Sequence, residues 1–250
     1  MIELRNISKT FHKGTANEIQ LLDRFNLKIE NGEFVVLIGS NGSGKSTLLN
    51  LLAGTIHPDE GEILLDGKDI SRLKDYERSK WIARIFQDPL AGTSQELSIL
   101  ENFRLAAIRG RKKGLRIGTG EAFRAEVSGK IAKLNLGLEK KLDQNMGTLS
   151  GGQRQALTLL MATMDDTRLL LLDEPAAALD PKTAALLMEL ASEIIKSMKL
   201  TAIMVTHQMK DMLKYGDRLV QLHEGKMIRD VNAGQKQNLQ LNDVFTWFGE

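Results

Sequence analysis

One stretch carries the clearest chemical signal in the sequence, Gly39-Ser40-Asn41-Gly42-Ser43-Gly44-Lys45-Ser46-Thr47. Its spacing is G-x-x-x-x-G-K-S, the pattern of a loop that binds phosphate between a strand and a helix. The glycines let the backbone curl so that successive N–H groups point at phosphate oxygens. Lys45 would supply a mobile charge for the β- and γ-phosphates, and the Ser46 hydroxyl is the expected Mg²⁺ ligand. The alternative is a glycine-rich turn with a solvated lysine.

The elements on both sides of this loop favour the phosphate site. The apolar run 34–38 predicts a buried strand, and residues 48–53 predict a helix that Gly54 closes. Upstream, residues 25–29 alternate apolar and polar side chains, which predicts a half-buried strand. Because Asn31-Gly32 lies between these two strands, we expect a β-hairpin there.

Two acids follow the apolar run 169–172, which predicts a strand buried on both faces. Carboxylates at the end of such a strand are costly unless they meet a metal or take a proton, and ligands bind at the carboxyl ends of parallel strands. We therefore expect Asp173 to hold the Mg²⁺ shell and Glu174 to orient and deprotonate an attacking water. The alternative is an exposed acidic turn.

A second anion-binding helix start is predicted at Leu149-Ser150-Gly151-Gly152-Gln153, with Ser150 as the N-cap of a helix over 154–163. Taken alone this signal is weak, because Ser-Gly-Gly is common in loops. Asp180 is the expected cap of another helix, which starts at Pro181 and runs to about residue 199.

Three further polar or aromatic residues have an ordinary structural explanation from their surroundings alone. Phe11 lies in the first strand region and would be a core or edge aromatic. Gln87 follows a strand over 82–86 and would be a loop residue, and His207 follows a strand over 201–206 and would be a satisfied polar group.

The remaining segments give coarser expectations. Residues 75–84 are predicted to be helical. Within 96–147, residues 98–108 and 121–134 have helical spacing without strand-like alternation, so we place a helical insertion at about 88–160. A final hairpin is expected around Glu224-Gly225 and a short helix within 239–250. The basic run 109–116 is a solvated loop or, alternatively, a contact for anionic lipid or an acidic partner.

Composition limits the classes of protein. The chain has 250 residues, a formal net charge of +2 and no cysteine, which excludes disulfides and fits a reducing compartment. No stretch approaches the roughly 18 apolar residues of a membrane span, and the N-terminus does not have a signal-peptide pattern. We therefore expect a soluble chain that reaches any membrane through a partner, with no strong attraction to nucleic acid, no internal repeat and no C-terminal regulatory domain.

Taken together and in this order, the phosphate loop, Gln87, Leu149–Gln153, Leu169–Glu174, Asp180 and His207 resemble the ATP-binding cassette of ABC transporters over essentially the whole chain. The resemblance implies an α/β fold with a P-loop NTPase core, an N-terminal antiparallel β subdomain and an inserted helical subdomain. The expected core covers residues 1–87 and 161–250, the helical subdomain about 88–160, and all belong to a single ATP-binding domain.

The resemblance also implies a role for each motif residue. The phosphate loop binds ATP and Mg²⁺, with Ser46, Gln87 and Asp173 toward the metal. Glu174 is the catalytic base, His207 contacts the γ-phosphate, and Gln87 also links the site to the membrane subunit. Phe11 matches the aromatic that stacks on adenine, which reverses the ordinary explanation given above.

In this family the Ser150, Gly151, Gly152 and Gln153 segment of one subunit closes over the ATP of another, and Asp180 lies at the subunit interface. The resemblance therefore implies a head-to-tail dimer, either of two copies or with a related ATPase subunit. The expected partner is a transmembrane permease at the cytoplasmic face of the membrane, with a substrate-binding protein if the system imports.

The direction of transport and the cargo follow less directly from the sequence than the family resemblance does. Leu149–Gln153 matches the signature segment of this family. The helix after this signature lacks the usual arginine near Ala156 and the Ala-Arg pair at Leu160-Met161, and residues 144–148 lack the Glu-Arg-Gly-like stretch common in fused exporters. A separate small subunit resembles bacterial import systems, amino acids being a candidate cargo. The loop after Phe11 instead resembles exporters of the lipoprotein or macrolide type.

Two other classes are weighed against a transporter. One is a soluble ATPase of this family in DNA repair, ribosome work or iron–sulfur assembly. Ribosome-associated members usually carry two cassettes in one chain and DNA-repair members carry long coiled coils, and neither feature is present. A phosphate-loop kinase or GTPase would not need Leu149–Gln153 or His207.

Overall fold

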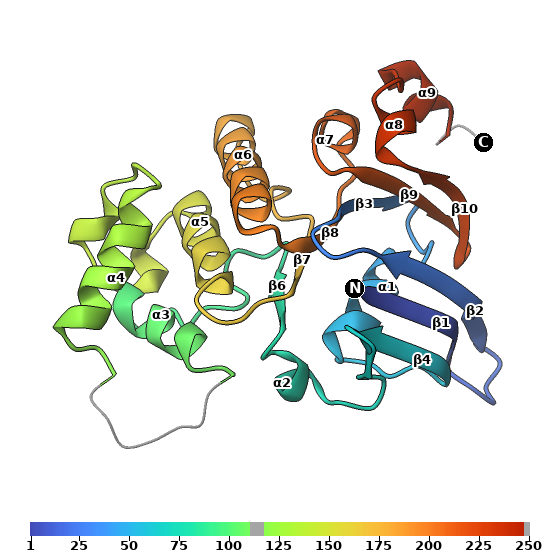
Figure 1. The fold of residues 1–250 in the computed structure, drawn as a ribbon, viewed down its shortest axis with the longest axis horizontal. Helices are drawn as coiled ribbons and strands as arrows, with labels where there is room; N and C mark the ends of the chain where they lie inside the picture. Colours follow the sequence, from blue (N-terminus) through green and yellow to red (C-terminus); the bar gives the residue numbers. More distant parts are fainter. Residues whose placement is uncertain (111–117, 248–250) are drawn as a thin grey trace. The chain divides into compact units, whose positions relative to one another are not determined.

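The computed structural model describes residues 1–110 and 118–247. They form two compact units, one of residues 1–78 with 195–250 and the other of residues 79–194 (Figure 1). Most of the basic run predicted at 109–116 lies outside the described residues. Arg109 itself is not solvated as predicted, because it donates to the carbonyl of Ala162 and to Thr167 Oγ1 at 2.7 Å.

The first unit contains an antiparallel sheet in the order β2-β1-β4-β5. Its strands are β1 (Ile2–Phe11), β2 (Ile19–Ile29), β4 (Glu60–Leu65) and β5 (Lys68–Asp69). In β2 the side chains of Phe25, Leu27 and Ile29 are buried while their neighbours are exposed, so the predicted half-buried strand is confirmed.

The same unit holds four further strands in the order β10-β9-β3-β8 (Figure 1). They are β3 (Phe34–Gly39), β8 (Thr201–Val205), β9 (Arg218–His223) and β10 (Lys226–Val231). β3 runs parallel to both β8 and β9, while β9 and β10 form the predicted terminal hairpin. Every residue of β3 and β8 is buried, as expected for parallel strands covered on both faces.

The hairpin predicted at Asn31-Gly32 is wrong. A turn is present there, but β2 pairs with β1 and β3 pairs with β8 and β9, so the turn carries the chain from one sheet to another. The Gly32 N–H donates to Thr201 Oγ1 at 3.0 Å, which fixes the turn to the start of β8. β3 is buried throughout and pairs with a parallel strand on each side, so it takes a central place in its sheet instead of pairing with β2.

Short helices complete the first unit: α1 (Lys45–Ala53), α2 (Asp75–Arg78), α7 (Met209–Lys214), α8 (Ala233–Lys236) and α9 (Leu241–Thr246). Gly54 ends α1 in the left-handed conformation and donates to the Asn50 carbonyl, so the predicted closing glycine is confirmed, as is the terminal helix. The helix predicted over 75–84 is wrong beyond Arg78, because residues 82–85 pair with another strand instead.

In the second unit β6 (Ile82–Ile85) and β7 (Leu169–Asp173) pair in parallel, as predicted for a buried strand before Asp173. The helices are α3 (Ile99–Ala107), α4 (Glu121–Ala132), η1 (Leu138–Lys140), η2 (Met146–Thr148), α5 (Gly151–Ala162) and α6 (Pro181–Met198), the last of which continues past residue 194. A core that includes Phe103, Val127 and Leu157 joins α3, α4 and α5. The subdomain bounds at 88 and 160 stay a prediction.

Within the described residues, no helix has both the length and the apolar character needed to cross a membrane.

Candidate functional site

The phosphate loop follows β3 and leads directly into α1. Its glycines take conformations that other residues rarely adopt, with φ of +151° at Gly39, +79° at Gly42 and +104° at Gly44. A Cβ at Gly39 would overlap the carbonyl oxygen of Leu222 on β9, so only glycine fits between the two strands. Lys45 is only 6% exposed, and its Nζ donates to the carbonyls of Gly39 and Ser40 at 2.8 Å each.

The loop fits a phosphate group by its own geometry. Ser40, Asn41, Gly42 and Ser46 are exposed at its rim, so the loop is open to a ligand. The Ser43 Oγ is buried and has no hydrogen-bond partner among the described residues, and the loop leads into the N-terminus of a helix, where anions bind. The donor set predicted for Mg²⁺, from Ser46, Gln87 and Asp173, is made of oxygen atoms, as that ion prefers.

His207 lies at the same edge of the first unit as the phosphate loop. β3 and β8 are parallel with Leu37 opposite Val205, so both strands end on one side of the sheet. The loop begins beyond β3 and His207 follows two residues after Val205, exposed to solvent. The structure thus brings these two predicted motifs to one sheet edge, which is where ligands bind in such sheets.

Phe11 is the last residue of β1, opposite Ile19 of β2, and its ring is partly exposed. The Lys9 Nζ lies 5.7 Å from the ring centroid and also bonds to Asp59 at 3.0 Å. A partly exposed aromatic residue at a strand end is compatible with stacking on a base, and that role stays a prediction.

In the second unit, Gln87 and the two acids Asp173 and Glu174 lie at one edge of the β6–β7 pair. Ile85 lies opposite Leu172, so Gln87 and the acids leave their strands on the same side. Asp173 Oδ2 accepts a hydrogen bond from Arg84 at 2.6 Å, and this ion pair is mostly buried, with side chains 17% and 14% exposed. Sequence inspection missed Arg84, although an arginine inside an apolar strand is an unusual choice that could have drawn attention.

Glu174 has φ of +47°, in the left-handed region where a glutamate is strained. Glu174 therefore lies outside the extended strand conformation, which ends at Asp173. Strained non-glycine residues of this kind cluster at functional sites, where the surrounding structure holds them.

The signature segment opens α5 as predicted. The Ser150 side chain accepts from the Gln153 N–H and the Gln153 side chain accepts from the Ser150 N–H, which confirms Ser150 as N-cap. Gly151 is half-buried, and a Cβ at Gly152 would overlap the methyl group of Thr183. The glycine therefore permits close packing between the signature and the start of α6.

Asp180 caps α6 as predicted, accepting the Thr183 N–H at 3.1 Å. A hydrogen bond from the Thr183 side chain is the main cause that lowers the pKa of the Asp180 carboxyl. Thr183 thus contacts both predicted interface motifs, Gly152 and Asp180.

Gln155 is a second residue that sequence inspection missed. It is 1% exposed on α5, and its Nε2 donates to the carbonyls of Phe86 at 2.7 Å and Pro175 at 3.0 Å. It therefore joins the loop that carries Gln87 to the turn that carries Glu174. The available signal was a glutamine within a run of small and apolar residues.

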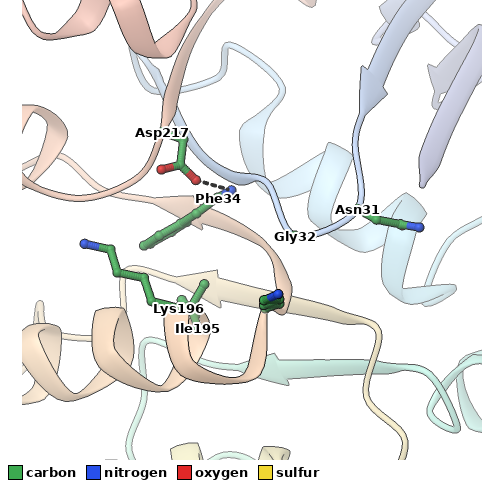
Figure 2. Close-up of a pocket in the computed structure, with 7 residues that line it drawn as sticks. Asn31, Gly32, Phe34, Ile195, Lys196 and Asp217 are labelled. Atoms are coloured by element: carbon green, nitrogen blue, oxygen red, sulfur yellow. Dashed lines mark hydrogen bonds between the residues drawn. The ribbon is translucent and has the colours of Figure 1, made fainter.

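A cavity of about 510 Å³ in the first unit lies away from these motifs. It is bounded by Asn31, Gly32, Phe34, Ile195, Lys196, Lys199 and Asp217, and Figure 2 shows Asp217 bonded to the Phe34 N–H. Phe34 begins β3, whereas the phosphate loop follows the other end of that strand. The cavity is therefore at the opposite edge of the sheet from the phosphate loop.

Comparison with known proteins identifies the family that carries these motifs. Residues 22–177 match the family model described as ABC transporter. The tyrosine transport ATP-binding protein of Clostridioides difficile (strain R20291) is 40% identical over 252 residues, which cover 99% of this chain and 98% of that protein.

The chain belongs to the ABC transporter family. It is an ATP-binding and ATP-hydrolysing subunit of that family, and the predicted α/β fold with a P-loop NTPase core is confirmed. The dimeric ATP-binding cassette MJ0796 bound to ADP and Pi is similar to this ABC ATPase with a TM-score of 0.78 and 30% identity, covering 93% of this chain and 99% of that one. The ADP form of MJ1267 gives a TM-score of 0.80 at 28% identity, covering 100% and 99%.

Proposed function

We propose that this ABC ATPase powers import of a small polar solute, with an amino acid as the candidate cargo. The observation that carries the proposal is the similarity to the tyrosine transport ATP-binding protein, which extends over nearly the whole length of both chains. The phosphonates import ATP-binding protein PhnC of Treponema denticola, a relative with another cargo, is 34% identical.

The roles in hydrolysis follow from the chemistry of the side chains. Lys45 and the backbone N–H groups of its loop hold the phosphates, and the buried Ser43 hydroxyl is available to them. Ser46, Gln87 and Asp173 would hold Mg²⁺, which neutralises phosphate charge when bound. Glu174 takes the proton of the attacking water, and His207 holds the γ-phosphate.

The signature residues are proposed to act on the nucleotide of a second subunit. Ser150 presents the N-terminus of α5, a helix of twelve residues with Gly151 and Gly152 in its first turn. Phe11 is proposed to stack on adenine, and Asp180 to lie at the interface between subunits. ATP would then join two chains head to tail and hydrolysis would release them, which drives a permease at the cytoplasmic face of the membrane.

The test of the catalytic assignment compares Glu174→Gln with Lys45→Ala in the purified chain. Glu174→Gln should bind ATP and form a lasting dimer with little turnover, because only the base is lost. Lys45→Ala should weaken ATP binding itself by at least about tenfold, since it removes a charged phosphate ligand. Light scattering and equilibrium nucleotide binding measure both, and a monomeric Glu174→Gln at saturating ATP would contradict the proposed sandwich.

The test of transport is a pull-down of the tagged chain from detergent-solubilised membranes. Recovery of a multi-span permease with a secreted binding protein is expected for import. Recovery of only soluble partners would exclude the proposed transporter and leave the ATPase assignment intact.

Export is a second candidate, because the macrolide export protein MacB of Campylobacter fetus is 35% identical over 96% of this chain. The match covers only 37% of that larger protein. A permease with a large extracytoplasmic domain, and no binding protein, would favour this candidate.

A further inference from the structure

The turn between β9 and β10 contacts the phosphate loop, although it belongs to none of the motifs. The N–H of Gly225 donates to the carbonyl of Ser43 at 3.0 Å. Just before the turn, Leu222 lies beside Gly39, the first glycine of the loop. Figure 1 shows the strand that carries this turn, β9, beside β3, the strand that the phosphate loop follows.

Gly225 is fixed on its other side by β2. A Cβ at Gly225 would overlap the carbonyl oxygen of Leu21, and Leu21 and Leu22 also approach Gly44 of the phosphate loop. Gly225 is buried, with φ of +72°. It therefore lies where the hairpin turn, the phosphate loop and the strand β2 meet, and glycine alone fits that position.

The hydrogen bond to Ser43 determines where the next amide points. A trans peptide is planar, so its C=O and N–H groups point in opposite directions, and none of the described peptide bonds is cis. When Gly225 holds the Ser43 carbonyl outward, the N–H of Gly44 is directed to the opposite side of the loop. An inward-directed N–H in a loop of this type is a phosphate ligand.

We propose that Gly225 is a positioning residue for ATP binding, which holds the Ser43–Gly44 peptide in the orientation that presents the Gly44 N–H to phosphate. The proposal rests on the phosphate site described above. It assigns no contact between Gly225 and the nucleotide, so Gly225 acts only through the loop.

The chain contains a matched control in the turn between β4 and β5. Both hairpins have two-residue turns in which both residues have positive φ: 46° and 72° at Glu224 and Gly225, and 50° and 78° at Asp66 and Gly67. A Cβ at Gly67 would meet no atom within 4 Å. Gly67→Ala therefore adds the same kind of backbone strain without disturbing the phosphate loop.

The experiment measures equilibrium binding of ATP with Mg²⁺ to Gly225→Ala and Gly67→Ala, each below its own unfolding temperature. Gly225→Ala should weaken binding by about tenfold or more, as loss of an aligned hydrogen bond to a charged ligand does. Gly67→Ala should stay within about twofold of the unchanged chain although it also loses stability. Near-equal affinity of Gly225→Ala and the unchanged chain, or an equal loss in both variants, would overturn the proposal.

Hydrogen exchange in the unchanged chain provides a second measurement if Gly225→Ala does not fold. Because coupling between two equilibria is reciprocal, ATP should slow exchange of the Gly225 amide more than that of the Gly67 amide. Equal slowing at both amides would overturn the proposal.

Lys45→Ala distinguishes a failure of the phosphate-site assignment from a failure of the Gly225 proposal. If Lys45→Ala binds ATP normally, the phosphate site itself is misassigned. If Lys45→Ala loses ATP binding and Gly225→Ala does not, the phosphate site is correctly assigned and the proposed role of Gly225 is wrong.

Discussion

At the scale of single residues, the two adjacent acids Asp173 and Glu174 are held in place in different ways. Asp173 is held by Arg84 in a mostly buried ion pair, whereas Glu174 is held by a backbone conformation that costs on the order of 1 kcal/mol for a residue other than glycine. Glycine at position 174 should therefore relieve a strain that alanine keeps, while both variants lack the carboxylate needed for hydrolysis.

We predict that Glu174→Gly abolishes ATP hydrolysis and has a free energy of unfolding up to about 1 kcal/mol higher than that of Glu174→Ala. Both variants lack the carboxylate, and only glycine takes positive φ without strain. Denaturant unfolding and phosphate release measure the two effects. A Glu174→Gly variant no more stable than Glu174→Ala would show that the turn is not strained.

At the scale of elements, two helices begin with the same capping arrangement. Comparing them distinguishes the effect of a cap on stability from its effect on catalysis. Ser98 caps α3 with Glu101, and Ser150 caps α5 with Gln153, each in a reciprocal capping box. Only the α5 box lies in the signature, so the α3 box is its control.

We predict that Ser98→Ala and Ser150→Ala each lower the free energy of unfolding by about 1 kcal/mol, the usual value of a serine cap. Only Ser150→Ala should reduce ATP-dependent dimerisation and turnover. Urea unfolding measures the change in stability, and light scattering with ATP measures dimerisation. Equal turnover of both variants would remove Ser150 from the proposed composite site.

The helix α8 is tied to the end of α7 by a buried lysine. Lys236, 6% exposed, donates to the carbonyl of Tyr215 and to that of Gly216 at 2.8 Å. Burial lowers the pKa of Lys236 to about 8, while the nearby Asp217 acts in the opposite sense. The folded chain therefore releases this proton at a lower pH than the unfolded chain does.

Because the unfolded state holds the Lys236 proton up to about pH 10.5, stability should rise with pH between about 8 and 10.5. The slope from one such group is at most about 1.4 kcal/mol per pH unit. Below pH 8 both states are protonated and the slope should vanish. The measurement is the difference in unfolding free energy between the unchanged chain and Lys236→Met across this range, and a flat difference would contradict the assignment.

At the scale of the whole molecule, each chain carries one phosphate loop and one signature. The loop with His207 belongs to the first unit, and the signature with Asp180 belongs to the second. If the dimer is head to tail, a site needs the loop of one chain and the signature of another.

Mixing two impaired variants tests that arrangement. A dimer of Lys45→Ala with Ser150→Ala has one doubly damaged site and one intact site, so we predict that the mixture has more ATPase activity than either variant alone. Phosphate release at a series of mixing ratios measures it, with activity greatest near equal amounts. No recovery at any ratio would indicate that loop and signature act within one chain.

The sequence by itself determined the local features of this protein. The strand–loop–helix around Lys45, the caps at Ser150 and Asp180, and the closing glycine Gly54 all follow from contacts within a few residues along the chain. Propensity, capping and periodicity act over that range, so they can be read without the fold. The motif order also carried the family resemblance.

Only the tertiary structure decided which strands are neighbours and which side chains meet. The Asn31-Gly32 turn has hairpin chemistry, yet β3 pairs with β8 and β9, far away in sequence. The Arg84–Asp173 pair and the Gly225–Ser43 hydrogen bond join residues 89 and 182 positions apart. No periodicity encodes such contacts, because they arise when buried strands satisfy their backbone groups with whatever neighbour the complete core provides.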